Sequence, residues 1–475
     1  MAVEVDANTL EGMVTAVPTG KIDIDTLGRL AEAGLVDTVL CVFPDMQGRF
    51  LGKRVVPRFF LEEVLGSSGL HACEYLLTVD MDMQVIPGYK FASWQTGYGD
   101  FSLVPDLATL RICPWIDKTA IVICDLEDEE TGELIAVAPR SILKRQLERA
   151  RAAGYTVNMA SELEFYLFND SYRTIADADY RTLRPSSTYI IDYHMLQTTR
   201  DEHVIRKIRN DMLAAGIPIE FSKGEAGHGQ HEINITYADA LEAADNHSVF
   251  KHGCREIADA AGMAITFMAK WSMQQAGSSC HIHSSLWNAE NTDSLMWDER
   301  QPYNMSKTFQ HYLAGQLATA RELCWMFAPL VNSYKRYQPA SWAPTACVWS
   351  GDNRTVGYRT VGHGRGFRVE NRTPGADANV YLAFAATIAA GLYGIEHRLE
   401  LPERFEGNAY AAEDVTRLPY SLHEAILEFE KSEVAREMFG EDVFQHLLHC
   451  AKQEQSALDN NVVTDWEVQR YFEQA

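Results

Sequence analysis

The stretch that decides the fold is Ser161-Glu162-Leu163-Glu164-Phe165-Tyr166-Leu167-Phe168, in which carboxylates alternate with large apolar side chains. Successive side chains of a β-strand point to opposite faces of the sheet. Glu162 and Glu164 therefore share one face, and Leu163, Phe165 and Leu167 share the other. The apolar face can pack on a core. The pattern predicts a strand whose second face lines a polar site.

Three further segments alternate in the same way: Gly229-Gln230-His231-Glu232-Ile233-Asn234-Ile235, Cys280-His281-Ile282-His283-Ser284-Ser285-Leu286 and Phe367-Arg368-Val369-Glu370-Asn371-Arg372. His281 shares a face with His283, and Arg368, Glu370 and Arg372 share another. Carboxylates with one or two histidines suit hard divalent metal ions, and arginines add recognition of phosphate or carboxylate groups. The combination predicts ATP chemistry on a carboxylic acid.

Composition sets wider limits. The 475 residues are 46% hydrophobic and 23% charged, which is typical of a globular protein with about two to four domain-sized units. The net charge of -24 disfavours nucleic acid and anionic membranes as partners, because both require a basic surface.

The location expected from the sequence is cytoplasmic. The nine cysteines are odd in number and never spaced as Cys-x-x-Cys, which is typical of reduced thiols. The first residues lack the basic region of a signal peptide, and no apolar stretch approaches the ~20 residues that span a bilayer.

The predicted fold class is α+β. Residues 1–20 are expected to form a flexible tail, 21–125 a small β-rich domain and 126–475 a larger domain of strands and helices. Spacing and capping residues predict helices at 138–154, 204–215, 238–262, 305–327 and 381–399, and throughout 419–475.

Six motifs occur in a fixed order: Glu162-x-Glu164, Glu225 with Glu232, His281-x-His283, Asn332-Ser333-Tyr334-Lys335-Arg336, Asp352-Asn353-Arg354-Thr355 and Arg368 to Asp377. From about residue 21 to the C-terminus, this order resembles the glutamine synthetase family. The resemblance implies an N-terminal β-grasp domain and a catalytic domain built on an incomplete β-barrel with helices. It also implies a homo-oligomer of two stacked hexameric rings, with active sites between subunits.

The resemblance implies a reaction in which ATP phosphorylates the γ-carboxylate of L-glutamate and a nitrogen nucleophile displaces the phosphate. ATP and two or more Mg²⁺ or Mn²⁺ ions per site are the implied cofactors. One metal ion would be held by Glu164, Glu225 and Glu232, and the other by Glu162, His281 and Glu370.

Other residues carry over by the same resemblance. Nucleotide contacts match His283, Ser285, Arg359, Arg365 and Arg368, with arginine at 365 where the family often has lysine. Gly277, Arg336 and Arg372 match contacts to glutamate, and Arg354 matches the arginine that steadies the transferred phosphoryl group.

The departures from the family pattern concern the amine. Glutamine synthetases carry a flap glutamate in a pattern like Arg-x-x-Pro-x-x-Glu-Ala-Pro, and Trp342 occupies that position in Arg336 to Pro344. Tryptophan offers no base, but its π face suits an alkylammonium ion. Asp45 is expected to supply the acidic group of the amine site from a neighbouring subunit, with either Tyr189 or Tyr193 beside it.

These features resemble the γ-glutamyl-amine ligase branch, which joins glutamate to a primary amine such as a polyamine, ethanolamine or another alkylamine. Asp45, Arg354 and Trp342 are the predicted catalytic residues. The alternatives are an ammonia-dependent glutamine synthetase and an inactive regulatory homologue. Tyr410 resembles an adenylylated tyrosine, but its neighbours match poorly, so no such control is expected.

Overall fold

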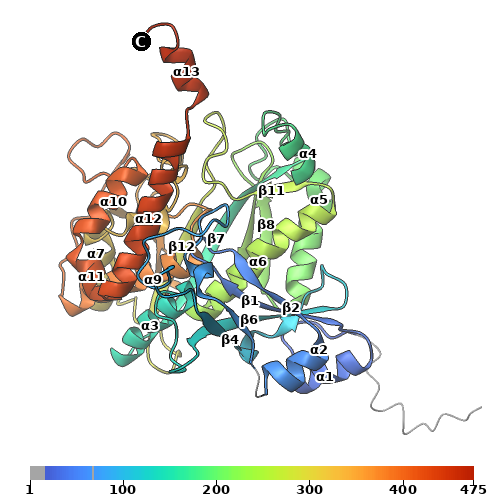
Figure 1. The fold of residues 1–475 in the computed structure, drawn as a ribbon. Coiled ribbons are helices and arrows are strands. Elements are labelled where there is room, and N and C mark those ends of the chain that lie inside the picture. The colour runs from blue at the N-terminus through green and yellow to red at the C-terminus, as the bar shows by residue number, and fades with distance from the viewer. Residues whose placement is uncertain (1–16, 67–68) are drawn as a thin grey trace, which may run out of the picture.

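The computed structural model describes residues 17–66 and 69–475 (Figure 1). The predicted flexible tail, 1–20, lies mostly outside these ranges. Where the described chain begins, the Gly20 amide donates a 2.6 Å hydrogen bond to the Ala214 carbonyl, which ties this segment to the larger domain. No helix in the described ranges is both long and apolar enough to cross a membrane.

The N-terminal sheet has the order β2-β1-β6-β4-β3, with β5 paired to β6. β1 runs antiparallel to β2 and parallel to β6, as expected for a β-grasp domain. The strands are β1 (Thr38–Pro44), β2 (Phe50–Val55), β3 (His71–Cys73), β4 (Asp100–Pro105), β5 (Arg111–Ile112) and β6 (Thr119–Asp128). The predicted domain boundary after residue 125 falls inside β6.

The second sheet has the order β13-β14-β15-β12-β7-β9-β8, with β10 and β11 also paired to β7. All four alternating segments of the sequence lie in it as strands. The strands are β7 (Thr156–Phe168), β8 (Ile219–Gly224), β9 (Gln230–Ile235), β10 (Ala238–Asp239), β11 (Ala264–Thr266), β12 (Cys280–Trp287), β13 (Trp349–Gly351), β14 (Tyr358–Val361) and β15 (Arg368–Asn371).

Helices flank this central sheet. Figure 1 shows α5 and α6 on one side and the group of α7, α9 and α10 to α12 on the other. The helices are α1 (Ile24–Glu32), α2 (Pro57–Phe59), α3 (Pro139–Ala152), α4 (Tyr172–Asp177), α5 (Met195–Ala214), α6 (Ala240–Ala260), α7 (Lys307–Ala318), α8 (Cys324–Phe327), α9 (Val380–Glu396), α10 (Leu422–Lys431), α11 (Glu433–Phe439), α12 (Glu441–Asn461) and α13 (Asp465–Tyr471).

Three helix predictions need correction. The stretch 419–475, expected to be helical throughout, is divided into α10, α11, α12 and α13, with breaks at Ser432, at Gly440 and over 462–464. The helix expected over 305–327 is divided into α7 and α8, because the chain leaves the α-helical path at Thr319, whose hydroxyl bonds back to the Gly315 carbonyl. The helix expected over 204–215 begins earlier, at Met195, where the His194 ring accepts a hydrogen bond from the Gln197 amide and caps the helix.

α9 is buried on nearly every side, which explains its run of alanine and other apolar residues. It packs against α7 and α3. A Cβ atom at Gly394 would lie 2.1 Å from the His311 carbonyl oxygen of α7. Glycine is therefore needed at 394 for the two helices to approach this closely.

A buried arginine joins the two sheets. The Arg140 side chain is 2% exposed and forms ion pairs with Asp106 and Asp125 of the N-terminal domain and with Asp245 of α6. Fork-shaped donors can satisfy several carboxylates at once, so Arg140 compensates buried charge from both sides of the contact. This contact fixes the N-terminal domain against the helices that support the second sheet.

Candidate active site

The antiparallel pairing of β7 sets the geometry of the site. Glu162 of β7 lies opposite His281 of β12, and Glu164 lies opposite Glu232 of β9. On the other edge of β12, His283 lies opposite Glu370 of β15. Three strand contacts thus gather the side chains that the sequence placed on the polar faces.

The first cluster consists of carboxylates alone. Glu164, Glu225 and Glu232 each offer an oxygen atom, and these atoms lie within 4.8 Å of one another. Burial, together with the Glu162 and Glu164 carboxylates, raises the pKa of Glu232 to about 8. Mutual repulsion of this kind is relieved by a cation, and an all-oxygen donor set fits Mg²⁺ or Mn²⁺. These three residues would hold the metal ion assigned to them from the sequence.

Gln230 and Ser279 hold Glu164 in place. The Gln230 side-chain amide and the Ser279 backbone amide donate hydrogen bonds of 3.1 and 2.8 Å to the same carboxylate oxygen. The sequence analysis identified neither of these two partners. Gln230 lies two residues before Glu232 on the same strand face, which was the only signal available for it.

The second cluster contains both histidines. Glu162, His283 and Glu370 offer ligand atoms within 4.8 Å of one another. The predicted ligand, His281, lies against the same carboxylates, with its Nδ1 atom 3.2 Å from Glu162 and 3.5 Å from Glu370. The mixed carboxylate and imidazole donors fit a divalent metal ion, and both histidines are within reach of it.

Charge partners set the protonation of this cluster. Burial lowers the pKa of His281, as does the nearby Arg372 guanidinium, which favours the neutral ring that can bind a metal ion. Although burial alone would raise it, the pKa of Glu370 is lowered to about 2 by Arg372 and the two histidines. Glu370 is therefore an anion that accepts bonds from Arg372 at 2.5 Å and from Arg359 at 2.9 Å.

A cavity of about 410 Å³ opens beside the second cluster. Glu162 reaches both the cluster and the cavity. The predicted nucleotide contacts His283, Ser285, Arg365 and Arg368 all line it, together with Asn158, Glu220, Tyr237 and Trp287, which the sequence analysis did not select. Its size and its arginines fit a nucleotide.

Neighbouring contacts fix the cavity wall. Arg368 donates a 3.0 Å hydrogen bond to Nδ1 of His283, which orients the ring. The Arg365 guanidinium lies 4.8 Å from the centre of the Trp287 ring. Arg359 and Arg354 lie outside the cavity lining: Arg359 is paired with Glu370 and Asp352, and Arg354 is exposed on the turn before β14.

The predicted glutamate contacts lie together. Arg336 is buried and donates to the carbonyl oxygens of Thr373 and Arg372 at 2.8 and 2.9 Å. A Cβ atom at Gly277 would lie 2.7 Å from Cγ of Arg336, so this close approach requires glycine. The buried Nε atom of Arg372 has no hydrogen-bond partner among the described residues. Such an unmatched donor fits an arriving carboxylate.

Trp342 lies on a strained loop beside Arg372. Ala340 and Trp342 have φ angles of 57° and 66°, a conformation that costs free energy for residues other than glycine. The loop is held by a 3.2 Å bond from Arg372 to the Trp342 carbonyl and a 3.0 Å bond from the Tyr410 hydroxyl to the Ala343 carbonyl. The indole itself is 60% exposed and is available to a substrate.

Asp45 lies apart from these groups. Its carboxylate is fully buried, accepts hydrogen bonds from the backbone amides of Gln47 and Arg49, and pairs with the Arg49 guanidinium at 2.7 Å. Burial raises the pKa of Asp45, and Arg49 opposes that shift. The geometry therefore gives Asp45 a role in holding the turn after β1, and contact with an amine stays a prediction.

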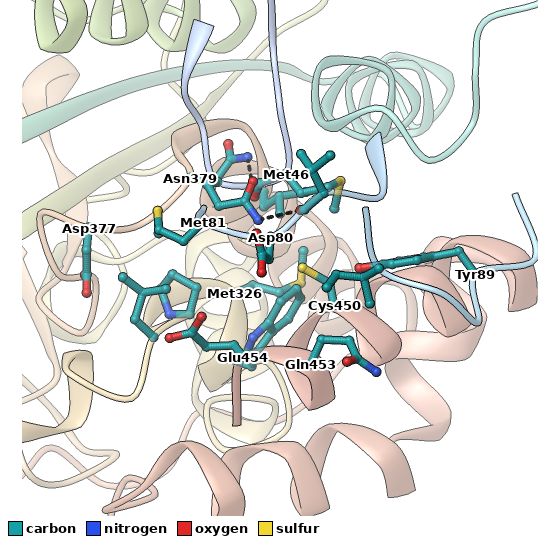
Figure 2. Close-up of a pocket in the computed structure, with 17 residues that line it drawn as sticks. Met46, Asp80, Met81, Tyr89, Met326, Asp377, Asn379, Cys450, Gln453 and Glu454 are labelled. Atoms are coloured by element: carbon teal, nitrogen blue, oxygen red, sulfur yellow. Dashed lines mark hydrogen bonds between the residues drawn. The ribbon is translucent and has the colours of Figure 1, made fainter. Parts of the chain in front are cut away.

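The turn that follows Asp45 borders a second, smaller cavity at the contact between the domains (Figure 2). Asn379 donates 3.1 Å hydrogen bonds to the carbonyls of Asp45 and Met46 at its edge. The cavity holds about 50 Å³ of space, enough for one or two water molecules but not for glutamate or a nucleotide. This hollow is separate from the candidate active site.

Comparison with known proteins identifies the class. The family model described as "Glutamine synthetase, catalytic domain" matches residues 136–471. The chain is 48% identical over 463 residues to a gamma-glutamylethanolamide synthetase of Streptomyces coelicolor, covering 98% of each protein. It is 38% identical over 441 residues to a glutamate–isopropylamine ligase of a Pseudomonas species, covering 92% of this chain and 95% of that protein.

A solved complex of GmaS with ADP has the same fold. It superposes with a TM-score of 0.81 at 28% identity, covering 94% of this chain and 99% of that one. The chain belongs to the glutamine synthetase family. These relatives, one named for an ethanolamide product and one for an isopropylamine substrate, agree with the γ-glutamyl-amine branch that the motifs indicated.

The two clusters should bind metal independently. Glu232→Gln removes a charge from the first cluster, and Glu162→Gln removes one from the second, so each variant should lose one class of bound Mn²⁺ and keep the other. Calorimetric titration of the purified protein with Mn²⁺ measures both classes. Glu220→Gln, which changes a carboxylate of the cavity wall outside both clusters, is the matched control. Loss of both classes in either single variant would contradict two separate sites.

Proposed function

We propose that this protein is an ATP-dependent ligase that joins the γ-carboxylate of L-glutamate to a primary amine. The observation that carries the proposal is the placement of two clusters of potential metal ligands on one sheet face, beside a nucleotide-sized cavity and the Nε atom of Arg372, which has no partner among the described residues. Ethanolamine and other small alkylamines are the first candidates, because the relative of 48% identity is named for an ethanolamide product and the relative of 38% identity for its substrate isopropylamine.

The reaction has two steps. A γ-carboxylate oxygen of glutamate attacks the terminal phosphorus of ATP, an O–P bond forms, and the bond to ADP breaks. The amine nitrogen then attacks the acyl carbon of γ-glutamyl phosphate, a C–N bond forms, and inorganic phosphate leaves with the electron pair of the C–O bond. The ammonium ion of the incoming amine loses protons before and during this attack.

The residues have distinct parts in these steps. Arg372 and Arg336 bind and orient glutamate, while His283, Ser285, Arg365 and Arg368 position the nucleotide. Mg²⁺ or Mn²⁺ ions held by the clusters would neutralise charge on the transferred phosphoryl group. Arg354, exposed at the turn before β14, has a guanidinium without an ion pair among the described residues and is proposed to steady that group as it moves.

Trp342 selects the amine in this proposal. Its exposed indole gives an apolar wall and a π face where the family's flap glutamate would give a base. Its carbonyl is bonded to Arg372, so the residue proposed to bind glutamate also positions the loop that meets the amine.

An amine panel tests the function directly. Phosphate release is measured with glutamate, ATP and Mg²⁺ in the presence of ammonium, methylamine, ethanolamine, isopropylamine, putrescine or spermine. Turnover with at least one alkylamine should exceed turnover with ammonium, because the loop offers an apolar surface and lacks the flap base. Highest turnover with ammonium would instead indicate a glutamine synthetase, and no turnover with any amine would indicate an inactive homologue.

Trp342→Glu tests the selectivity loop. A positioned base contributes about 10²–10⁴-fold to a reaction, so turnover with ammonium should rise at least about tenfold while kcat/KM for the preferred alkylamine falls. Trp342→Phe keeps the apolar face and should retain the original preference. If both variants leave the ratio of the two activities unchanged, Trp342 has no part in choosing the amine.

We also propose that the protein forms a homo-oligomer of two stacked hexameric rings and that it is located in the cytoplasm. α13 extends away from the body of the chain (Figure 1), and the segment 462–475 that contains it exposes apolar side chains, including Val463 at 75%, Trp466 at 60% and Phe472 at 89%. Surfaces of this kind are usually covered by another protein chain. A second copy of this chain is the proposed cover.

Removal of residues 462–475 tests whether this segment contacts a second copy of the chain. Static light scattering should show a smaller assembly for the truncated protein than for the full chain at the same concentration, because the apolar contact is lost. Tyr180→Ser, which changes an exposed aromatic residue elsewhere, should leave the mass unchanged. An unchanged mass after truncation would mean that α13 does not support the assembly.

A further inference from the structure

Lys223, near the end of β8, places its ammonium group among the carboxylates of the first cluster. Its Nζ atom forms an ion pair with Glu225 and lies 3.7 Å from Glu232, and its side chain is only 16% exposed. The position follows from strand register, because Lys223 lies directly opposite Glu232 on β9. The arrangement is therefore built into the sheet.

Lys223 is the cation of this cluster. Among the described residues, the ion pairs of Glu225 and Glu232 are made with Lys223, while Glu164 accepts only the neutral donors Gln230 and Ser279. Arg359 and Arg372 pair with Glu370 of the other cluster. One lysine thus offsets part of the negative charge that the three carboxyl groups carry together.

The ammonium group and a divalent metal ion compete for the same oxygen atoms. The three ligand oxygens lie within 4.8 Å of one another, and an ion bound to all of them would lie close to Nζ of Lys223 in its present position. Like charges at such a distance repel strongly where water is scarce. Metal binding and the Lys223 ion pairs therefore exclude each other.

A second position for the Lys223 ammonium group lies beside the one it occupies among the carboxylates. Nζ of Lys223 is 5.1 Å from the centre of the Tyr193 ring, a distance at which a cation is attracted to the aromatic face. Tyr193 is 66% exposed, so a lysine that moves toward the ring also moves toward solvent. The long, flexible lysine side chain allows this movement without a change in the strand.

We propose that Lys223 is a built-in counter-cation of the Glu164–Glu225–Glu232 cluster, and that a divalent metal ion binds there only as the ammonium group withdraws toward Tyr193. The inference rests on the proposed metal-dependent ligase. It explains how three carboxylates keep their positions before metal arrives.

Lys223→Met tests the inference on the full-length protein, with Mn²⁺ alone as the probe. The Mn²⁺ class that Glu232→Gln abolishes should tighten about tenfold, since a repelling charge is gone, and the other class should keep its affinity. Without metal, the variant should melt at a lower temperature than the parent. Saturating Mn²⁺ should then raise its melting temperature by more than it raises that of the parent.

Two controls separate charge from shape. Lys223→Arg keeps the cation and should keep the parent affinity, whereas Lys307→Met removes an exposed lysine of α7 and should change neither class. Unchanged or weaker Mn²⁺ binding in Lys223→Met overturns the counter-cation inference. Absence of any Mn²⁺ binding by the parent protein would instead overturn the metal-dependent function on which it rests.

Discussion

The pairing of β7 with β9 on one edge and with β12 on the other is the constraint on which the rest of the site depends. It sets Glu164 opposite Glu232 and Glu162 opposite His281, so that acidic groups from distant parts of the chain converge. Register in a sheet is fixed by the apolar residues of the opposite face, here Leu163, Phe165 and Leu167. Core packing thus holds together side chains whose charges repel.

Positively charged side chains around the clusters compensate this repulsion between carboxylates. Around Glu370 the chain supplies Arg359, Arg372 and His281, and the pKa of the carboxyl falls to about 2. Around Glu232 it supplies a single lysine, and the pKa rises to about 8. The two clusters therefore differ in how much negative charge remains for a metal ion to neutralise, although both lie on the same sheet face.

The loop that carries Trp342 is connected to these charged residues through Arg372. Arg372 shares its donors between Glu370 and the Trp342 carbonyl and keeps Nε free of any partner among the described residues. A carboxylate that binds Nε of Arg372 would therefore contact the residue that also holds the Trp342 loop. The strained backbone at Ala340 and Trp342 persists because Arg372 and Tyr410 hold its carbonyl groups.

The sequence by itself determined the four strands of the site and the family, and it predicted the carboxylates that meet in both clusters, because alternation with period 2 and the spacing of the motifs are local properties of the chain. Its helix prediction for 305–327 was wrong, because the chain leaves the α-helical path at Thr319. Only the tertiary structure decided that Lys223 lies among the carboxylates, that His283 reaches the second cluster and that Asp45 is buried at the domain contact. These facts depend on which strands become neighbours and in what register, and no short stretch of sequence contains that information.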